Sequence, residues 1–347
     1  MLAPSSGSYF IIADSIKKIT VTDESLFQLS VMNDSIHLRS MENDYGNFFS
    51  IQFVGDDSSS MRMRCLNPRQ RGHQYQNNFT ITIQNHELKI VNQVDLENYV
   101  AGVVEAEVGS KQSVEYYKVQ AIICRTYALS NLRRHEEENF NLCDNVHCQA
   151  YKGNNGLNRE ISAATFLTKN LVLVDKKSEL ITTAFHSNCG GQTCNSEDVW
   201  GLQKAYLRSV KDTFCLRQRN AQWTKLIPKA AWMEYLTLNC SSCSSDSTWL
   251  CCDFKQEQRK IFMLIKNTQI PVKNIRSDFK LKSSFFSLME QNDSVVFIGR
   301  GYGHGVGLCQ EGAIQMAKAG LQYIYILHYY YKDIDIINLN QLHFFKE

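Results

Sequence analysis

Two glutamates, Glu105 and Glu107, could perform acid–base chemistry at the end of a segment with helical periodicity. Side chains two residues apart on a helix point about 200° apart, so the two carboxylates cannot face the same site. Glu107 falls beside the apolar stripe that contains Val100 and Val104, whereas we expect Glu105 to be solvated on the opposite side. A carboxyl group against apolar surface has a raised pKa, which suits a general acid. The alternative is that Glu107 is a solvated glutamate at a helix end.

A second group combines two histidines with two cysteines: His135, Cys143, His147 and Cys148. Such side chains, spaced as they are in a loop, can hold a tetrahedral zinc ion. The spacing differs from the paired Cys-x-x-Cys of a zinc ribbon, so two alternatives stay open. One is a disulfide between Cys143 and Cys148, and the other is a set of unlinked core residues.

The run 299–307 places a glycine at every second position ahead of a predicted helix at 309–319. Glycines let the backbone approach a ligand closely, and the amides at a helix N-terminus favour anionic or polar oxygen atoms. The run lacks the Gly-Lys-Ser/Thr of a phosphate loop, and its strict alternation departs from Gly-x-Gly-x-x-Gly. It therefore predicts a ligand-lining loop that contains His304, with a tight turn as the alternative.

The other cysteines allow several readings. Cys309 stands at a helix start near His304, where a thiol nucleophile is one option. Single cysteines such as Cys124 and Cys215 are usually small core hydrophobes. A further cluster could be a zinc knuckle, two disulfides or accidental crowding; it comprises Cys240, Cys243, Cys251 and Cys252.

The elements that must position these groups change in character along the chain. Strand-like runs at 16–21, 27–31, 48–54, 79–83 and 88–91 precede predicted helices at 96–108, capped by Asp95, and 114–134, capped by Ser113. The two helices are joined by a short break and should form a hairpin. Further on, the sequence predicts a helix at 160–168 and strands at 171–174, 180–185 and 295–298.

The sequence thus predicts an α+β fold with a β-rich N-terminal lobe packed on a core that has a helical hairpin and mixed β-structure. The four expected segments are the lobe at 1–93, the core at 94–214, a cysteine-containing excursion at 215–290, and 291–347, which completes the core. With 347 residues, 37 basic against 35 acidic side chains and a net charge of +2, the chain gives no reason to expect nucleic acid as partner. No stretch approaches the roughly 18 apolar residues of a membrane span, and no signal peptide is visible at the N-terminus.

Taken together, these segments resemble the SpoIID/LytB family, the stage II sporulation protein D and amidase-enhancer group. Matching stretches occur in the family's order, whereas 1–90 and 215–290 carry no recognisable family motif. The stretches are LENYVAGVVEAE at 96–107, KVQAIICRTYAL at 118–129, HCQAYKG at 147–153, HSNCGGQT at 186–193, SEDVWG at 196–201, YLRSV at 206–210, and GYGHGVG at 301–307 with QEGA at 310–313.

The resemblance implies a lytic transglycosylase that cleaves the glycan backbone of bacterial peptidoglycan, with a preference for strands stripped of their stem peptides. It places the catalytic glutamate at Glu107, although Val108 follows where the family usually has Met-Pro. It also implies a zinc site and no organic cofactor, the zinc ligands being His135, Cys143 and Cys148. Residues expected to bind substrate in or near the cleft beside Glu107 are Arg125, His147, Tyr206, Gly303, His304 and Gly305.

One carboxylate is enough for this reaction, because the sugar's own C6 hydroxyl attacks the anomeric carbon, whereas ordinary glycosidases need two. Glu197 or Asp198 could supply a second carboxylate, which keeps hydrolysis open. The amidase-enhancer branch implies an alternative, a non-catalytic peptidoglycan-binding protein that activates an N-acetylmuramoyl-L-alanine amidase. The partners would be glycan strands, or a cell-wall amidase in the alternative. Either function implies a location outside the cytoplasm, in the periplasm or cell wall.

Overall fold

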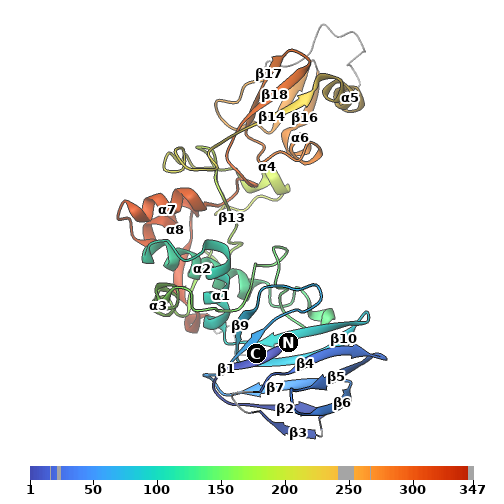
Figure 1. Ribbon diagram of the computed structural model, residues 1–347. Helices are drawn as coiled ribbons and strands as arrows, with labels where there is room; N and C mark the ends of the chain where they lie inside the picture. Colours follow the sequence, from blue (N-terminus) through green and yellow to red (C-terminus); the bar gives the residue numbers. More distant parts are fainter. Residues whose placement is uncertain (16, 22–24, 241–253, 266, 343–347) are drawn as a thin grey trace. The chain divides into compact units, whose positions relative to one another are not determined.

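The computed structural model describes residues 1–15, 17–21, 25–240, 254–265 and 267–342, and it contains two compact units (Figure 1). The first unit is Met1–Val172 and the second is Leu173–Glu347. Helices and strands occur in both units, which confirms the predicted α+β class. The division differs from the four expected segments, because the boundary falls inside the predicted core and leaves the helical hairpin in one unit with the N-terminal lobe.

The first unit begins with three antiparallel sheets, drawn in blue in Figure 1. The largest has the order β11-β10-β7-β2-β3, and the smaller ones are β1-β8-β9 and β4-β5-β6. Buried side chains such as Ile11, Phe53 and Ile81 alternate with more exposed ones and fill one common core. The strands are β1 (Leu2–Ser6), β2 (Tyr9–Ala13), β3 (Lys17–Thr20), β4 (Gln28–Met32), β5 (Ser35–Arg39), β6 (Asp44–Phe48), β7 (Ile51–Gly55), β8 (Ser60–Met63), β9 (His73–Gln76), β10 (Asn78–Gln84) and β11 (Glu87–Gln93).

The helices of the first unit begin where their capping residues predict. The Asp95 side chain accepts backbone hydrogen bonds at the start of the first helix, and Ser113 does so at the start of the second. The first helix ends at Gly109, which has a φ of 74°. The second ends four residues before the predicted position 134. The helices are α1 (Leu96–Val108), α2 (Val114–Ser130), the 3-10 turn η1 (Glu136–Glu138) and α3 (Arg159–Leu167).

A loop at 149–157 joins the helices to the sheets within the first unit. Tyr151 on this loop packs edge-on against Tyr75 of β9, with ring centroids 5.8 Å apart. Gly102 of α1 leaves room for the loop, because a Cβ there would lie 2.7 Å from the carbonyl oxygen of Gly153. Gly153 itself has a φ of 69° and lies against the backbone of Gln74. The N-terminal lobe therefore packs on the helical hairpin through this loop, as predicted.

The second unit contains several short sheets and helices. A buried core around Trp232 and Phe297 lies under β14 and β18, which pair in antiparallel register from Gln222 with Arg300 (Figure 1). β12 (Leu171–Val174) crosses the boundary between the units. The remaining elements are β13 (Phe185–His186), α4 (Ser196–Trp200), β14 (Gln222–Pro228), α5 (Lys229–Asn239), β15 (Phe262–Ile265), β16 (Thr268–Pro271), α6 (Val272–Asp278), β17 (Phe286–Gln291), β18 (Ser294–Arg300), β19 (Leu308–Cys309), α7 (Gln310–Lys318), α8 (Tyr323–Tyr330), β20 (Asp335–Asn338) and the 3-10 turn η3 (Leu339–Gln341).

The glycine run packs against β13. β13 and β19 pair in parallel, with His186 beside Cys309 in register. Gly303 has a φ of 113°, and a Cβ there would lie 2.8 Å from the Cβ of His186. Only glycine meets both conditions without strain. The strand predicted at 180–185 is wrong, because β13 begins only at Phe185.

Candidate functional site

Glu107 lies on the last turn of α1 and is half-buried. Its Oε1 accepts a hydrogen bond from the backbone N–H of Ala150 at 3.1 Å. Burial raises the pKa of the Glu107 carboxyl, and the hydrogen bond from Ala150 opposes this only in part. The carboxyl group thus has the environment that the sequence predicts for a general acid.

Glu105 is buried, which corrects the expectation that it is solvated. Its Oε1 accepts from the backbone N–H of Asn155 at 3.2 Å, and its Oε2 accepts from the N–H of Leu157 at 3.0 Å. The sequence could not show this, because the partners lie some 50 residues further along the chain. Glu105 therefore anchors the loop at 155–157.

We expect Glu105→Gln to lower the free energy of unfolding by about 1–3 kcal/mol, the usual cost of leaving a buried group unsatisfied. Glutamine has one acceptor oxygen, so its amide N–H₂ would face a backbone donor of the loop. Urea denaturation measures the difference, with Glu137→Gln at an exposed position as the matched control. Equal stability of the two variants would contradict the anchoring role.

The predicted metal group is assembled in the first unit, where all four ligand atoms lie within 4.8 Å of one another. The Sγ of Cys148 lies 3.4 Å from Nε2 of His135 and 3.8 Å from Nδ1 of His147. The Sγ of Cys143 lies 3.6 Å from the same Nδ1. Both cysteines are free thiols in the structure. Two sulfurs and two imidazoles at this separation fit a tetrahedral zinc ion.

The surroundings favour His135 as a ligand more than His147. The Nδ1 of His135 lies 2.5 Å from the Glu138 carboxylate, so the opposite nitrogen, Nε2, is free to face the sulfurs. A carboxylate behind a histidine ligand is typical of zinc sites. His147 is exposed, and its Nε2 lies 3.2 Å from a guanidinium nitrogen of Arg134. Ligation through Nδ1 would leave Nε2 protonated and facing that donor, so His147 fits a more weakly held fourth position.

The metal group and Glu107 are linked by a short stretch of chain. Ala150, which donates to Glu107, follows Cys148 by two residues. Between them, Gln149 is buried and its Oε1 lies 3.3 Å from the hydroxyl of Tyr99 on α1. A ligand or bond that fixes the position of Cys148 would therefore also help to fix the Ala150 N–H that donates to Glu107.

Arg125 is buried within the first unit, which corrects its expected contact with substrate. Its guanidinium donates to both carboxylate oxygens of Glu97, with Nε 2.9 Å from Oε1. It also donates to the backbone carbonyls of Thr165 and Leu171. Arg125 therefore holds α1, α2 and α3 together and has no donor left for a glycan.

Tyr206 in the second unit is buried as well, and its substrate role is likewise corrected. Its hydroxyl accepts from the backbone N–H of Thr182 at 3.1 Å. Gly305 is buried against Cys194, so this glycine serves close packing. Gly303 is half-buried and lies against His186. Residues 303–307 belong to the second unit and Glu107 to the first. The cleft expected between them therefore stays a prediction.

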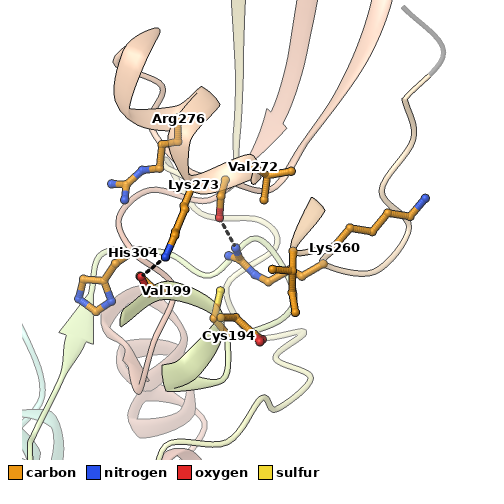
Figure 2. Close-up of a pocket in the computed structure, with 11 residues that line it drawn as sticks. Cys194, Val199, Lys260, Val272, Lys273, Arg276 and His304 are labelled. Carbon is orange, nitrogen blue, oxygen red and sulfur yellow. Dashed lines mark hydrogen bonds between the residues drawn. The ribbon is translucent and has the colours of Figure 1, made fainter. Parts of the chain in front are cut away.

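His304 lines a pocket within the second unit (Figure 2). Its Nδ1 accepts from the backbone N–H of Val306 at 3.0 Å, and burial lowers its pKa to about 4, so the ring is neutral at neutral pH. Figure 2 shows Arg276 and Lys273 at the same end of the pocket as His304. Basic side chains outnumber acidic ones in the lining, which includes Asp198, Arg259, Lys260, Lys273, Arg276 and His304.

Two side chains that were not predicted from the sequence lie in or next to this pocket. Trp200 at the end of α4 is 47% exposed, and its ring centroid lies 5.3 Å from that of His304. Arg276 is half-buried, and its Nε has no hydrogen-bond partner among the described residues. Trp200 could have been singled out, because it belongs to the motif at 196–201. Arg276 could not, because it lies in the excursion that carries no motif.

Three further expectations can be compared with the structure. Glu197 forms an ion pair with Arg208, whose hydrogen bonds lower the pKa of the carboxylate to about 2. Cys309 is buried, and burial raises the pKa of its thiol, which disfavours a nucleophilic role. Cys240 is disulfide-bonded, whereas the other three cysteines of that cluster lie outside the described residues.

Within the described residues, no helix is long and apolar enough to span a bilayer.

Comparison with known proteins agrees with the motifs. Residues 84–174 match the family model described as Stage II sporulation protein. The chain is 27% identical to Stage II sporulation protein D of Bacillus subtilis over 261 residues, which cover 71% of this chain and 75% of that protein. An uncharacterized protein of Brachyspira hyodysenteriae is also 27% identical, over 78% of this chain and 74% of its own length. The Amidase enhancer of Bacillus subtilis is 25% identical over 66% of this chain, but over only 39% of its own length. These similarities support an assignment of the chain to the SpoIID/LytB family.

Proposed function

We propose that the protein is a lytic transglycosylase that acts on the peptidoglycan glycan backbone of the bacterial cell wall, outside the cytoplasm. The observation that supports this most is the carboxyl of Glu107, half-buried and with a raised pKa. Burial and one backbone hydrogen bond account for that pKa, and no carboxylate among the described residues is a cause of the shift. Glycosidases that use water need two carboxylates at the scissile bond, whereas an internal hydroxyl needs only one acid–base group.

In the proposed reaction, Glu107 first donates its proton to the glycosidic oxygen as the bond from that oxygen to the anomeric carbon breaks. The C6 hydroxyl of the same muramic acid residue then attacks the anomeric carbon, and its proton passes to the Glu107 carboxylate. The product is a 1,6-anhydro sugar and the enzyme returns to its starting state. No water is consumed, so Glu107 alone balances the protons.

The basic pocket of the second unit supports a preference for strands without stem peptides. Removal of the peptide leaves a free lactyl carboxylate on each muramic acid residue. Arg276 lines this pocket, its Nε has no hydrogen-bond partner among the described residues, and a guanidinium is suited to bind a carboxylate. The exposed ring of Trp200 beside His304 offers an apolar face against which a sugar could pack. We propose that this pocket holds a muramic acid residue of the strand.

We also propose zinc at His135, Cys143 and Cys148, with His147 in the fourth position. The chemistry of the donor set and the carboxylate behind His135 support this assignment. When bound, the ion would hold the loop at 143–150 and so keep the Ala150 N–H at Glu107. No organic cofactor is needed for the proposed reaction.

A non-catalytic activator of an N-acetylmuramoyl-L-alanine amidase is the second candidate, because one relative is named Amidase enhancer. Mass spectrometry of peptide-free glycan strands incubated with the protein separates the two. Strands that end in 1,6-anhydro-muramic acid support the transglycosylase, and new reducing ends mean hydrolysis. Strands that remain intact, together with faster peptide release by an added amidase, support the activator.

We expect His304→Ala to reduce glycan cleavage at least tenfold, which corresponds to about 1.4 kcal/mol of transition-state stabilisation. The ring lines the pocket and lies beside Trp200, and its Nδ1 also accepts from the backbone N–H of Val306 in the glycine run. The rate of anhydro-end formation and the melting temperature should both be measured. The matched control is His328→Ala, at an exposed position of α8. A variant that melts early yet cleaves at the normal rate when folded would assign His304 a purely structural role.

A further inference from the structure

A second set of metal-ligand side chains lies in the core of the second unit. Cys189, Asp212, Cys215 and Cys309 are all buried, and their ligand atoms lie within 4.8 Å of one another. The Sγ of Cys189 is 3.4 Å from that of Cys215 and 3.3 Å from Oδ2 of Asp212. The four residues come from three segments that are far apart in the sequence. Only the folded chain brings these four side chains together.

The separations suit one ion at the centre of the four groups. Zn–S bonds of about 2.3 Å at tetrahedral angles place two sulfurs about 3.8 Å apart. The observed sulfur–sulfur contact of 3.4 Å is close to this value and well beyond the roughly 2.05 Å of a disulfide bond. A disulfide between Cys189 and Cys215 would also leave Cys309 and Asp212 without a role.

Backbone amides point at the sulfur of Cys309. It accepts from the N–H of Cys189 at 3.3 Å and from the N–H of Gly312 at 3.4 Å. Sulfur is a weak acceptor as a thiol and a much better one as a thiolate, so this arrangement suits a deprotonated ligand. One N–H of the first turn of α7, that of Gly312, therefore faces the cluster, and Cys309 serves as the N-cap of this helix.

The carboxylate of Asp212 is fully buried without a basic partner. Its Oδ2 accepts from the hydroxyl of Tyr330 at 2.9 Å, and its Oδ1 accepts from the N–H of Phe214 at 3.0 Å. No lysine, arginine or histidine forms an ion pair with it in the part of the chain that the structure describes. Burial raises the pKa of the Asp212 carboxyl, so a charged carboxylate at this position needs a partner, and a metal ion would supply one. Gly312 leaves space for this carboxylate, since a Cβ there would collide with it and with the Tyr330 hydroxyl.

We propose that Cys189, Asp212, Cys215 and Cys309 form a closed, four-ligand zinc site that is separate from the group around Cys148. Three thiolates with one carboxylate oxygen select zinc over magnesium or calcium, which prefer oxygen alone. With all four positions taken by protein, the site is structural. It ties β19 and α7 to the segment at 189–215, and Cys309 is in register with His186. It therefore stabilises the strand pair against which the glycine run packs.

The test is the zinc content of the full chain, expressed with zinc and purified under reducing conditions without added chelator. We expect Cys215→Ser and Cys309→Ser each to contain one zinc per chain fewer than the parent protein. Cys194→Ser is the matched control, because this cysteine is buried in the same unit but lies outside the cluster, and it should lose none. The double variant Cys148→Ser/Cys215→Ser should lose two zinc ions, which separates the two sites.

A second measurement tests the site if the Cys215→Ser and Cys309→Ser variants fail to fold. X-ray absorption at the zinc edge of the Cys148→Ser protein reports the remaining site, and we expect three sulfurs and one oxygen as ligands. Unchanged zinc content in folded Cys215→Ser and Cys309→Ser would overturn the proposal. So would a peptide in which Cys189 and Cys215 are disulfide-linked, or a zinc-free protein with all three thiols free. Glycan cleavage is assayed separately, so none of these outcomes bears on the role of Glu107.

Discussion

Glu107→Gln is expected to reduce glycan cleavage by roughly 10²–10⁴-fold, the usual contribution of a general acid–base group. The substitution removes the only proton donor of the proposed reaction at nearly constant volume. The amide oxygen can still accept from the Ala150 N–H, so the melting temperature should change little. The measurement is the rate at which peptide-free strands acquire 1,6-anhydro ends.

Glu105→Gln provides the matched control on the same helix. It should unfold more easily but keep its specific activity when folded, because Glu105 anchors the loop at 155–157. Glu107→Gln would then lose activity without losing stability, and Glu105→Gln would lose stability without losing activity. If both variants lost cleavage equally, Glu107 would not be the single catalytic acid.

The pH profile gives an independent reading of the same group. The proposed reaction requires Glu107 to be protonated at the start, so the rate should fall as the pH rises through its pKa. Because burial raises that pKa, the fall should lie above the ordinary glutamate value of about 4.3. A profile that is flat through this range would mean that another group supplies the proton.

Cys148→Ser is expected to lose one zinc per chain and to cleave glycan at least tenfold more slowly. The loop at 143–150 would lose its anchor, and the Ala150 N–H would no longer be held at Glu107. That hydrogen bond favours the charged carboxylate, so its loss should move the high-pH limb of the rate profile further upward. Metal analysis and the pH profile of the same preparation check both effects.

Cys65→Ser is the control for this experiment, because Cys65 is an exposed thiol of the same unit outside either metal group. It should keep its zinc and its rate. A Cys148→Ser protein that is zinc-free but fully active would show that the ion does not position Glu107. A parent protein that is metal-free and lacks two titratable thiols would establish the disulfide between Cys143 and Cys148 instead.

Local signals in the sequence were sufficient for most of the elements. Asp95 and Ser113 cap helices that begin at the next residue, because a capping side chain bonds to backbone only two or three positions away. The position of Glu107 relative to the apolar stripe of α1 followed from helical spacing alone. The metal group around Cys148 could be predicted for a similar reason, since its four residues lie within fourteen positions of one another.

The errors concern residues whose environment depends on distant parts of the chain. Helical spacing places Glu105 away from the stripe, yet the loop at 155–157 covers it. Arg125 and Tyr206 are polar residues inside family motifs, and the structure shows that they are buried and bonded to the protein itself. Cys189 and Cys309 are 120 residues apart, and backbone pairing between their segments, including that of β13 with β19, brings them together.

The pairing of Gln222 with Arg300 has a consequence for how such a protein can change over evolutionary time. The segment between these residues begins and ends at neighbouring points, and it has its own apolar core around Trp232 and Phe297. A segment with adjoining ends can be exchanged with little disturbance to the chain that carries it. Arg276 belongs to this segment, while His304 lies just beyond it. Under the function proposed above, exchange of this segment would change the side chains that line the pocket, and with them the substrate preference, while the flanking chain stays the same.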